Sequence, residues 1–137
     1  MSLLERLSDG DRFAAEIGCS IVEIREGYAR TQLTVQQRHL NGAGVCQGGV
    51  MFTLGDLAFA AVANSSGVLS VGVNNSISFV RSAQLGETIT AECILAAEHH
   101  KLPQADIKIK NADGEVLAVM TGMAYRTQKP FEFEGLM

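Results

Sequence analysis

The sequence lacks a basic excess, a signal-peptide-like start and an apolar run long enough to cross a membrane. Its 11 Lys and Arg residues are outnumbered by 15 Asp and Glu, for a net charge of −4, whereas a nucleic-acid-binding protein needs a basic face. The opening MSLLERLSDGDRF is charged and amphipathic rather than basic and then apolar. The longest apolar run, Val50 to Ala63, is interrupted by Asp56 and is shorter than the roughly 20 residues that span a bilayer. We therefore predict neither a nucleic-acid nor a membrane partner.

Paired cysteines and metal-ligand motifs are also missing. Three isolated cysteines without a CxxC spacing are typical of reduced thiols. They predict a cytoplasmic protein in which the cysteines are small buried hydrophobic residues. None of the three histidines has a metal-ligand spacing, and the adjacent His99 and His100 would point to opposite faces of a strand. We therefore predict no metal site.

Without repeats, low-complexity tracts or linkers, residues 1–137 are predicted to form a single domain. Residues 3–17 have the apolar spacing of a short amphipathic helix. A second helix is predicted from about Gly49 to Asn64, and it is apolar on nearly all sides. Such a helix must pack on more than one side.

The remaining segments alternate apolar and polar residues, as strands do. Alternation on both sides of Glu26-Gly27 and of Asp113-Gly114 predicts two hairpins. Further strands are predicted over 68–82 and 87–100. The fold class is therefore α+β, with a curved antiparallel sheet of five to six strands wrapped around one long central helix.

Asp56 places an acid in the middle of this apolar helix, and no Lys or Arg lies between residues 39 and 67. One interpretation is structural, with the carboxylate satisfied by Thr53 or by a backbone group. Burying a carboxylate without a partner costs several kcal/mol. The cost of keeping an acid here favours a catalytic function.

The glycine-rich loop before the helix fits neither of two phosphate-binding motifs. Gly42, Gly44 and Gly48 do not have the G-x-G-x-x-G spacing, and the Gly-Lys-Ser/Thr of a P-loop is absent. The helix start offers a third chemistry, because its free backbone N–H groups stabilise negative charge. Gly48 and Gly49 let a substrate oxygen approach that backbone closely. These features predict an oxyanion hole, with Asp56 as nucleophile or general base.

The spacing of these groups requires two chains. Gly48 and Asp56 are eight positions apart, which is about 12 Å along one helix, so one carbonyl carbon cannot lie near both. Two antiparallel copies of the helix across a two-fold axis would bring the start of one beside the middle of the other. We therefore predict a homodimer with shared active sites.

This pattern resembles the hotdog-fold thioesterases of the PaaI type, acyl-CoA thioesterases related to phenylacetate degradation. The resemblance extends over nearly the whole chain, from the first hairpin to GMAYRT. The matching residues are Asn41, Gly48-Gly49, Asp56, the ANSSG at 63–67 and the ISFVRSAQLGETI at 77–89.

The resemblance implies an acyl-CoA thioesterase that yields free acid and coenzyme A, which is part of the substrate, so no cofactor is expected. The Gly48 N–H would polarise the thioester carbonyl, Asp56 of the partner subunit would attack it or activate water, and Asn41 would hold the loop. Asn74, 18 residues after the Asp, would position the water. Further family expectations are substrate contacts by Gly49, Arg81, His100 and Lys101, and pairing of dimers into a homotetramer.

Several alternatives remain open at this stage. Gln47 stands where the family has His, which preserves hydrogen bonding but not a proton-dependent role. Asn41 is also a plausible turn residue, and Arg81 a plausible solvated cation. Asn74 and its neighbour Asn75 face opposite sides of a strand, so only one can face the pocket. The alternative function is a non-catalytic acyl-CoA-binding hotdog module.

Overall fold

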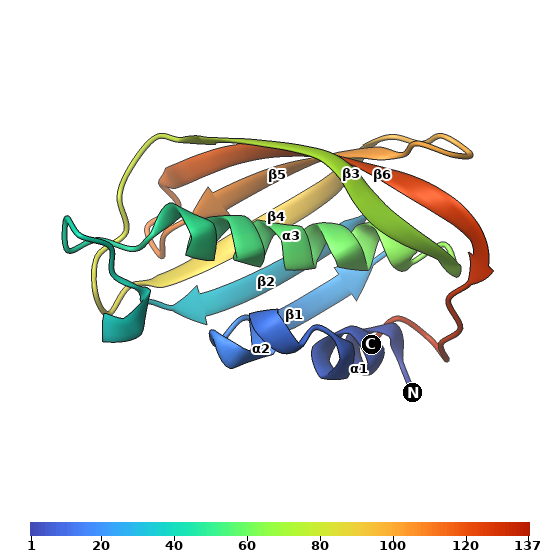
Figure 1. Cartoon of the computed structure of the whole chain (residues 1–137), viewed down its shortest axis with the longest axis horizontal. Coiled ribbons are helices and arrows are strands. Elements are labelled where there is room, and N and C mark those ends of the chain that lie inside the picture. The colour runs from blue at the N-terminus through green and yellow to red at the C-terminus, as the bar shows by residue number, and fades with distance from the viewer.

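A computed structural model describes residues 1–137 and shows a six-stranded antiparallel sheet curved around one long helix, α3 (Figure 1). This confirms the predicted hotdog architecture. The helices are α1 (Leu3–Gly10), α2 (Arg12–Glu16) and α3 (Gly48–Asn64), with a 3-10 turn, η1, at Gln37–His39. The strands are β1 (Ser20–Arg25), β2 (Tyr28–Thr34), β3 (Val68–Phe79), β4 (Thr88–Ala97), β5 (Gln104–Lys110) and β6 (Val116–Pro130).

The strands are ordered β1-β2-β4-β5-β6-β3, so β1 and β3 form the two edges of the sheet. Both predicted hairpins are present. Gly27 turns β1 into β2 with φ 71°, and Gly114 turns β5 into β6 with φ 81°. These left-handed backbone angles suit glycine, which is why both turns could be recognised.

The N-terminal segment is two helices rather than the single predicted one. Asp11 separates α1 from α2, and its backbone N–H donates to Leu7 O at the end of α1. Its carboxylate accepts from the backbone N–H of Ala14 at 3.1 Å. A residue that caps the second helix in this way has a non-helical backbone, and the chain turns there.

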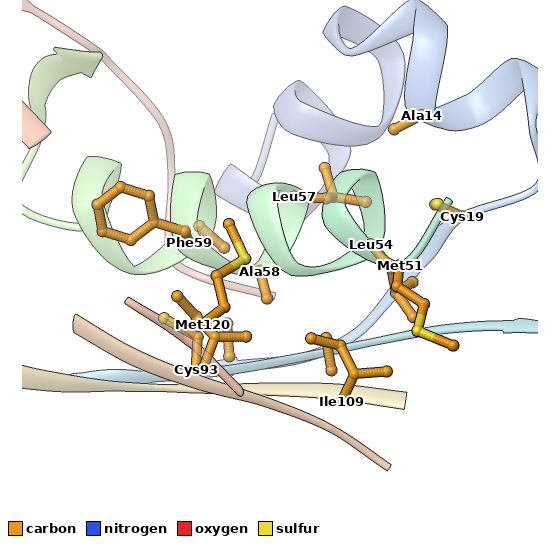
Figure 2. Close-up of a cluster of buried hydrophobic side chains, with 14 of the residues drawn as sticks. Ala14, Cys19, Met51, Leu54, Leu57, Ala58, Phe59, Cys93, Ile109 and Met120 are labelled. Carbon is orange, nitrogen blue, oxygen red and sulfur yellow. The ribbon is translucent and has the colours of Figure 1, made fainter. Parts of the chain in front are cut away.

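The core lies between the concave face of the sheet and α3, as Figure 2 shows. Gly55 allows close packing at this contact, since a Cβ there would lie 2.8 Å from the Met120 sulfur. On the opposite side of α3, Leu57 points towards Ala14 of α2. The central helix is therefore covered on two sides, as its apolar sequence predicts. None of the helices is both long enough and apolar enough to cross a membrane.

One stripe of α3 and the neighbouring edge of the sheet remain uncovered. The helix residues that are not buried, apart from Gly48 at its start, recur at the spacing of a single face. They are Gly49, Phe52, Thr53, Asp56 and Ala60. Beside this stripe, β3 has β6 as its one neighbouring strand and exposes Val71 (47%), Val73 (54%) and Phe79 (54%). An apolar edge strand of 12 residues is the kind of surface that pairs with another chain.

Candidate active site

The first turn of α3 leaves the backbone donor of Gly48 free. The Gln47 side chain caps the helix and accepts from the Gly49 N–H at 3.0 Å, and the Val50 N–H donates to Gln47 O. The Gly48 N–H has no acceptor within the chain. It therefore remains available to an outside oxygen at the positive end of the helix dipole.

The loop that leads into α3 is held in place by backbone hydrogen bonds. Cys46 donates to Ala83 O at 2.9 Å, and Gln47 donates to His39 O at 2.8 Å. The His39 ring is itself buried, between the Gln36 N–H at Nδ1 and Ile17 O at Nε2. Both ring nitrogens have protein partners, so His39 is a structural residue of this loop.

Asn41 fixes the turn of the glycine-rich loop. Its Oδ1 accepts from the backbone N–H groups of Ala43 at 2.9 Å and Val45 at 3.3 Å. It also lines the hollow in front of Gly48. The two interpretations of Asn41, a turn residue and a pocket residue, are thus compatible.

That hollow has a volume of about 400 Å³, within the range of small-molecule sites. Its lining comes from the loop, from α3 and from the end of β3 with the segment after it: Asn41, Val45, Cys46, Gly48, Met51, Phe79, Val80, Arg81 and Ser82. Burial raises the pKa of the Cys46 thiol to about 11. The thiol is protonated at neutral pH and is unsuited to act as a nucleophile.

Phe79 is a lining residue that the sequence analysis did not single out. A Cβ at Gly48 would lie 2.7 Å from its Cζ atom, so glycine at this position lets the ring lie against the helix start. The sequence feature that could have identified Phe79 is strand alternation, because Ile77 and Phe79 share a face of β3. That signal places the aromatic ring towards α3 but does not reveal which helix residue it meets.

Asp56 is half-buried on the exposed stripe of α3, and its carboxylate makes no hydrogen bond or ion pair within the chain. The structural interpretation through Thr53 does not hold, since that hydroxyl donates to Gly49 O at 2.8 Å. Burial raises the pKa of the Asp56 carboxyl above its usual value, and the negative charge of Asp11 raises it further. An unpaired acid with a raised pKa is typical of a catalytic position.

Within one chain the predicted residues fall into separate groups. Asn41, Gly48 and Arg81 meet at the hollow, with Gln47 and Gly49 beside it at the helix start. Asp56 lies two turns along α3 and does not line the hollow.

Three further predicted residues lie outside this group. The Asn74 side chain is exposed on β3. His100 and Lys101 lie in the β4–β5 connection. This connection is near the C-terminal end of α3, whereas Gly48 is at the other end of the helix (Figure 1). Arg81 reaches the hollow but also pairs with Glu115 at 3.3 Å. A single chain therefore does not bring these residues to one thioester.

Comparison with known proteins gives the family. Residues 43–118 match the model of the thioesterase superfamily. A protein of Archaeoglobus fulgidus is 34% identical over 133 residues, which cover 94% of this chain and 86% of that protein. The acyl-coenzyme A thioesterase PaaI of Escherichia coli is 33% identical over 118 residues, covering 86% of this chain and 84% of PaaI.

Solved structures agree. The structure of E. coli PaaI superposes with a TM-score of 0.86 at 30% identity, covering 94% of this chain and 99% of that chain. A Streptococcus mutans protein solved bound to acetyl-CoA superposes with a TM-score of 0.78 at 25% identity, covering 82% and 91%. This chain therefore belongs to the thioesterase superfamily, as a hotdog-fold thioester hydrolase of the PaaI type.

Proposed function

We propose that this protein hydrolyses acyl-CoA thioesters, with the Gly48 N–H as oxyanion donor and Asp56 of the partner subunit as nucleophile or general base. The observation that carries the proposal is a complementary pair on one helix: a free donor at its start and an unpaired acid on its exposed stripe. The relatives support the substrate class, since E. coli PaaI is an acyl-coenzyme A thioesterase and the S. mutans protein binds acetyl-CoA.

The Gly48 N–H would donate to the thioester carbonyl oxygen as negative charge develops there, which is worth several kcal/mol. If Asp56 is the general base, it takes a proton from water while the water oxygen bonds to the carbonyl carbon. The C–S bond then breaks and the proton passes to the departing sulfur. If Asp56 is the nucleophile, its carboxylate displaces the thiolate to form an anhydride, which water then hydrolyses. Both routes end in free acid and coenzyme A.

The geometry supports a shared site across a homodimer. Gly48 and Asp56 lie on the same continuous helix, so the eight positions between them correspond to about 12 Å. The uncovered stripe of α3 and the open edge of β3 lie side by side. A second copy seated there across a two-fold axis would cover both features and place its Asp56 near this chain's Gly48. Pairing of dimers into tetramers, a cytoplasmic location and a role in phenylacetate degradation stay predictions.

The test is thiol release from a panel of aryl- and fatty acyl-CoAs, with Asp56→Asn as the matched variant. We expect the wild type to turn over at least one member. Asp56→Asn should lower kcat by orders of magnitude with a much smaller change in KM, because the amide keeps the size but not the charge. It should also unfold at a higher temperature, since a carboxyl with a raised pKa destabilises the fold when it is ionised.

Two results would count against the proposal. If Asp56→Asn hydrolyses its best substrate at the wild-type rate, Asp56 has no part in the mechanism. Tight acyl-CoA binding by the wild type without any thiol release favours the non-catalytic binding module.

A further inference from the structure

His39 is buried in the loop before α3 and does not line the hollow in front of Gly48. Its Nδ1 lies 2.8 Å from the backbone nitrogen of Gln36, and its Nε2 lies 2.6 Å from Ile17 O. The Gln36 N–H can only donate and the Ile17 carbonyl can only accept. Nδ1 is therefore without a hydrogen and Nε2 carries one. The two partners select this single neutral form of the ring, and a doubly protonated ring could not make both bonds.

The ring connects the loop to the end of α2. Ile17 is the residue at which this helix ends, where helix carbonyls lack partners inside the helix. Arg38, the neighbour of His39, binds the same end, since its Nη1 donates to Glu16 O at 2.7 Å. A Cβ at Gly18 would lie 3.3 Å from Arg38 Nη2, so the chain after α2 is in close contact with η1. The position of the loop therefore follows that of α2.

The backbone of His39 continues this connection to the proposed oxyanion donor. His39 O accepts from the Gln47 N–H at 2.8 Å, and the next peptide group carries the Gly48 N–H. Because a peptide group is planar, the direction of that N–H depends on how Gln47 is held. The path from Ile17 O to the Gly48 N–H thus consists of two hydrogen bonds that meet in one residue, His39.

An oxyanion donor is effective only over a narrow range of positions. The donor must lie about 2.7–3.1 Å from the place that the oxyanion takes, and a misplacement of about 1 Å can cost roughly 100-fold in rate. The Cys46 N–H holds the loop to Ala83 O in the segment after β3, and Asn41 holds the loop within itself. The His39 ring supports the loop from the side of α2.

We propose that His39 is a positioning residue of the thioester site, whose neutral ring fixes the Gly48 N–H relative to α2. This assignment rests on the proposed function. His39 touches no reacting atom in this account and acts through Gln47 and Gly48. The oxyanion forms in the transition state, so the effect of His39 should be seen in kcat rather than in KM.

The test compares two variants that each keep one hydrogen bond of the ring. His39→Gln keeps a donor where Nε2 lies and can still reach Ile17 O, but it loses the acceptor for Gln36. His39→Asn keeps an acceptor where Nδ1 lies, but it loses the bond to α2. We expect kcat within about three-fold of the wild type for His39→Gln and about 100-fold lower for His39→Asn. Both variants should keep KM and should melt lower than the wild type, because each leaves one buried polar group without a partner.

A double-mutant comparison tests whether His39 acts through the donor. Gly48→Pro has no N–H at this position, so His39→Asn in that background should lower kcat by less than about three-fold. Gly48→Ala keeps the N–H, and there the loss should again be about 100-fold. Substitutions that act through one group give such non-additive losses, whereas the effects of independent substitutions add.

Arg38→Met is the matched control. It removes the neighbouring hydrogen bond to the same end of α2, but Arg38 makes no hydrogen bond to Gln47. Its kcat should therefore stay within about two-fold of the wild type. His39→Phe keeps a ring in the same space and loses both hydrogen bonds. It takes the place of His39→Asn if the asparagine variant does not fold.

The outcomes separate this assignment from the proposed function. If His39→Asn keeps wild-type kcat while Asp56→Asn is inactive, the assignment alone is wrong. It is also wrong if His39→Asn loses the same factor in the Gly48→Pro and Gly48→Ala backgrounds, or if Arg38→Met loses as much kcat as His39→Asn. If the wild type releases no thiol from any acyl-CoA, both the assignment and the proposed function are wrong.

Discussion

Gly48 provides the sharpest test of the oxyanion donor, because two substitutions share one steric change and differ in one hydrogen. Gly48→Pro removes the N–H, whereas Gly48→Ala keeps it. Both add a Cβ at the position that lies 2.7 Å from Phe79 Cζ. The Phe79 ring is 54% exposed and can move aside in both variants. Any difference between the two variants therefore reports mainly on the N–H.

Proline is compatible with the fold at this position. Gly48 is the first residue of α3, where proline is well tolerated because that N–H has no partner in the helix. Gln47 has φ −67° and ψ 138°, in the extended region favoured before proline. We expect Gly48→Pro to melt no lower than Gly48→Ala, since proline also restricts the unfolded chain.

The expected magnitude follows from the chemistry of a single oxyanion donor, whose removal costs about 10²–10³ in kcat, or roughly 2.7–4 kcal/mol. Thiol release should therefore show Gly48→Pro about 100-fold or more below Gly48→Ala in kcat. Melting temperatures of the two variants serve as the control for folding. Equal kcat in the two folded variants would refute the assignment of the Gly48 N–H.

Two further predictions test the shared site and its acid. Co-refolding Gly48→Pro with Asp56→Asn in equal amounts should return about a quarter of wild-type activity, because about half of the dimers are mixed and each has one intact site of two. Verified mixed dimers without activity would contradict a site built from two chains. Asp11→Asn should lower the pKa of Asp56, since it removes the nearby negative charge that helps to raise it. Asp56 acts when ionised and activity is lost as pH falls through its pKa, so the acid limb of the kcat/KM profile should move to lower pH. If the acid limb of the kcat/KM profile does not move, a group other than Asp56 controls it. The asparagine keeps the cap on Ala14, so α2 should remain in place.

The fold could be predicted wherever local pattern determines it. Gly27 and Gly114 have the left-handed backbone that their hairpins require, and glycine after an acid is a recognisable turn signal. The central helix begins within one residue of its predicted start, because Gln47 and the glycines after it separate loop from apolar run. The break at Asp11 could not be predicted in the same way. The apolar spacing continues across it, and only the cap on Ala14 reveals two helices.

The site was harder to predict where it depends on contacts between distant segments. The free N–H of Gly48 and the acid at Asp56 follow from one helix and its spacing. The side that Asn74 and Asn75 face depends on a bulge against β6, which strand alternation in the sequence does not show. The approach of Phe79 to Gly48 likewise depends on how β3 returns along α3. Register and tertiary packing, rather than composition, determine these positions.

The glutamine at the start of α3 also becomes understandable from the contacts that it makes. Gln47 Oε1 accepts from the Gly49 N–H, and a Cβ at Gly49 would lie 2.5 Å from that oxygen. The role seen here is that of an acceptor and needs no titrating proton. A neutral histidine can also accept through a ring nitrogen, so a His at this position could make the same cap. Gln47 engages the second N–H of the helix, and the Gly48 N–H stays free to meet a carbonyl oxygen. The departure from the family pattern thus preserves the feature on which the proposed hydrolysis depends.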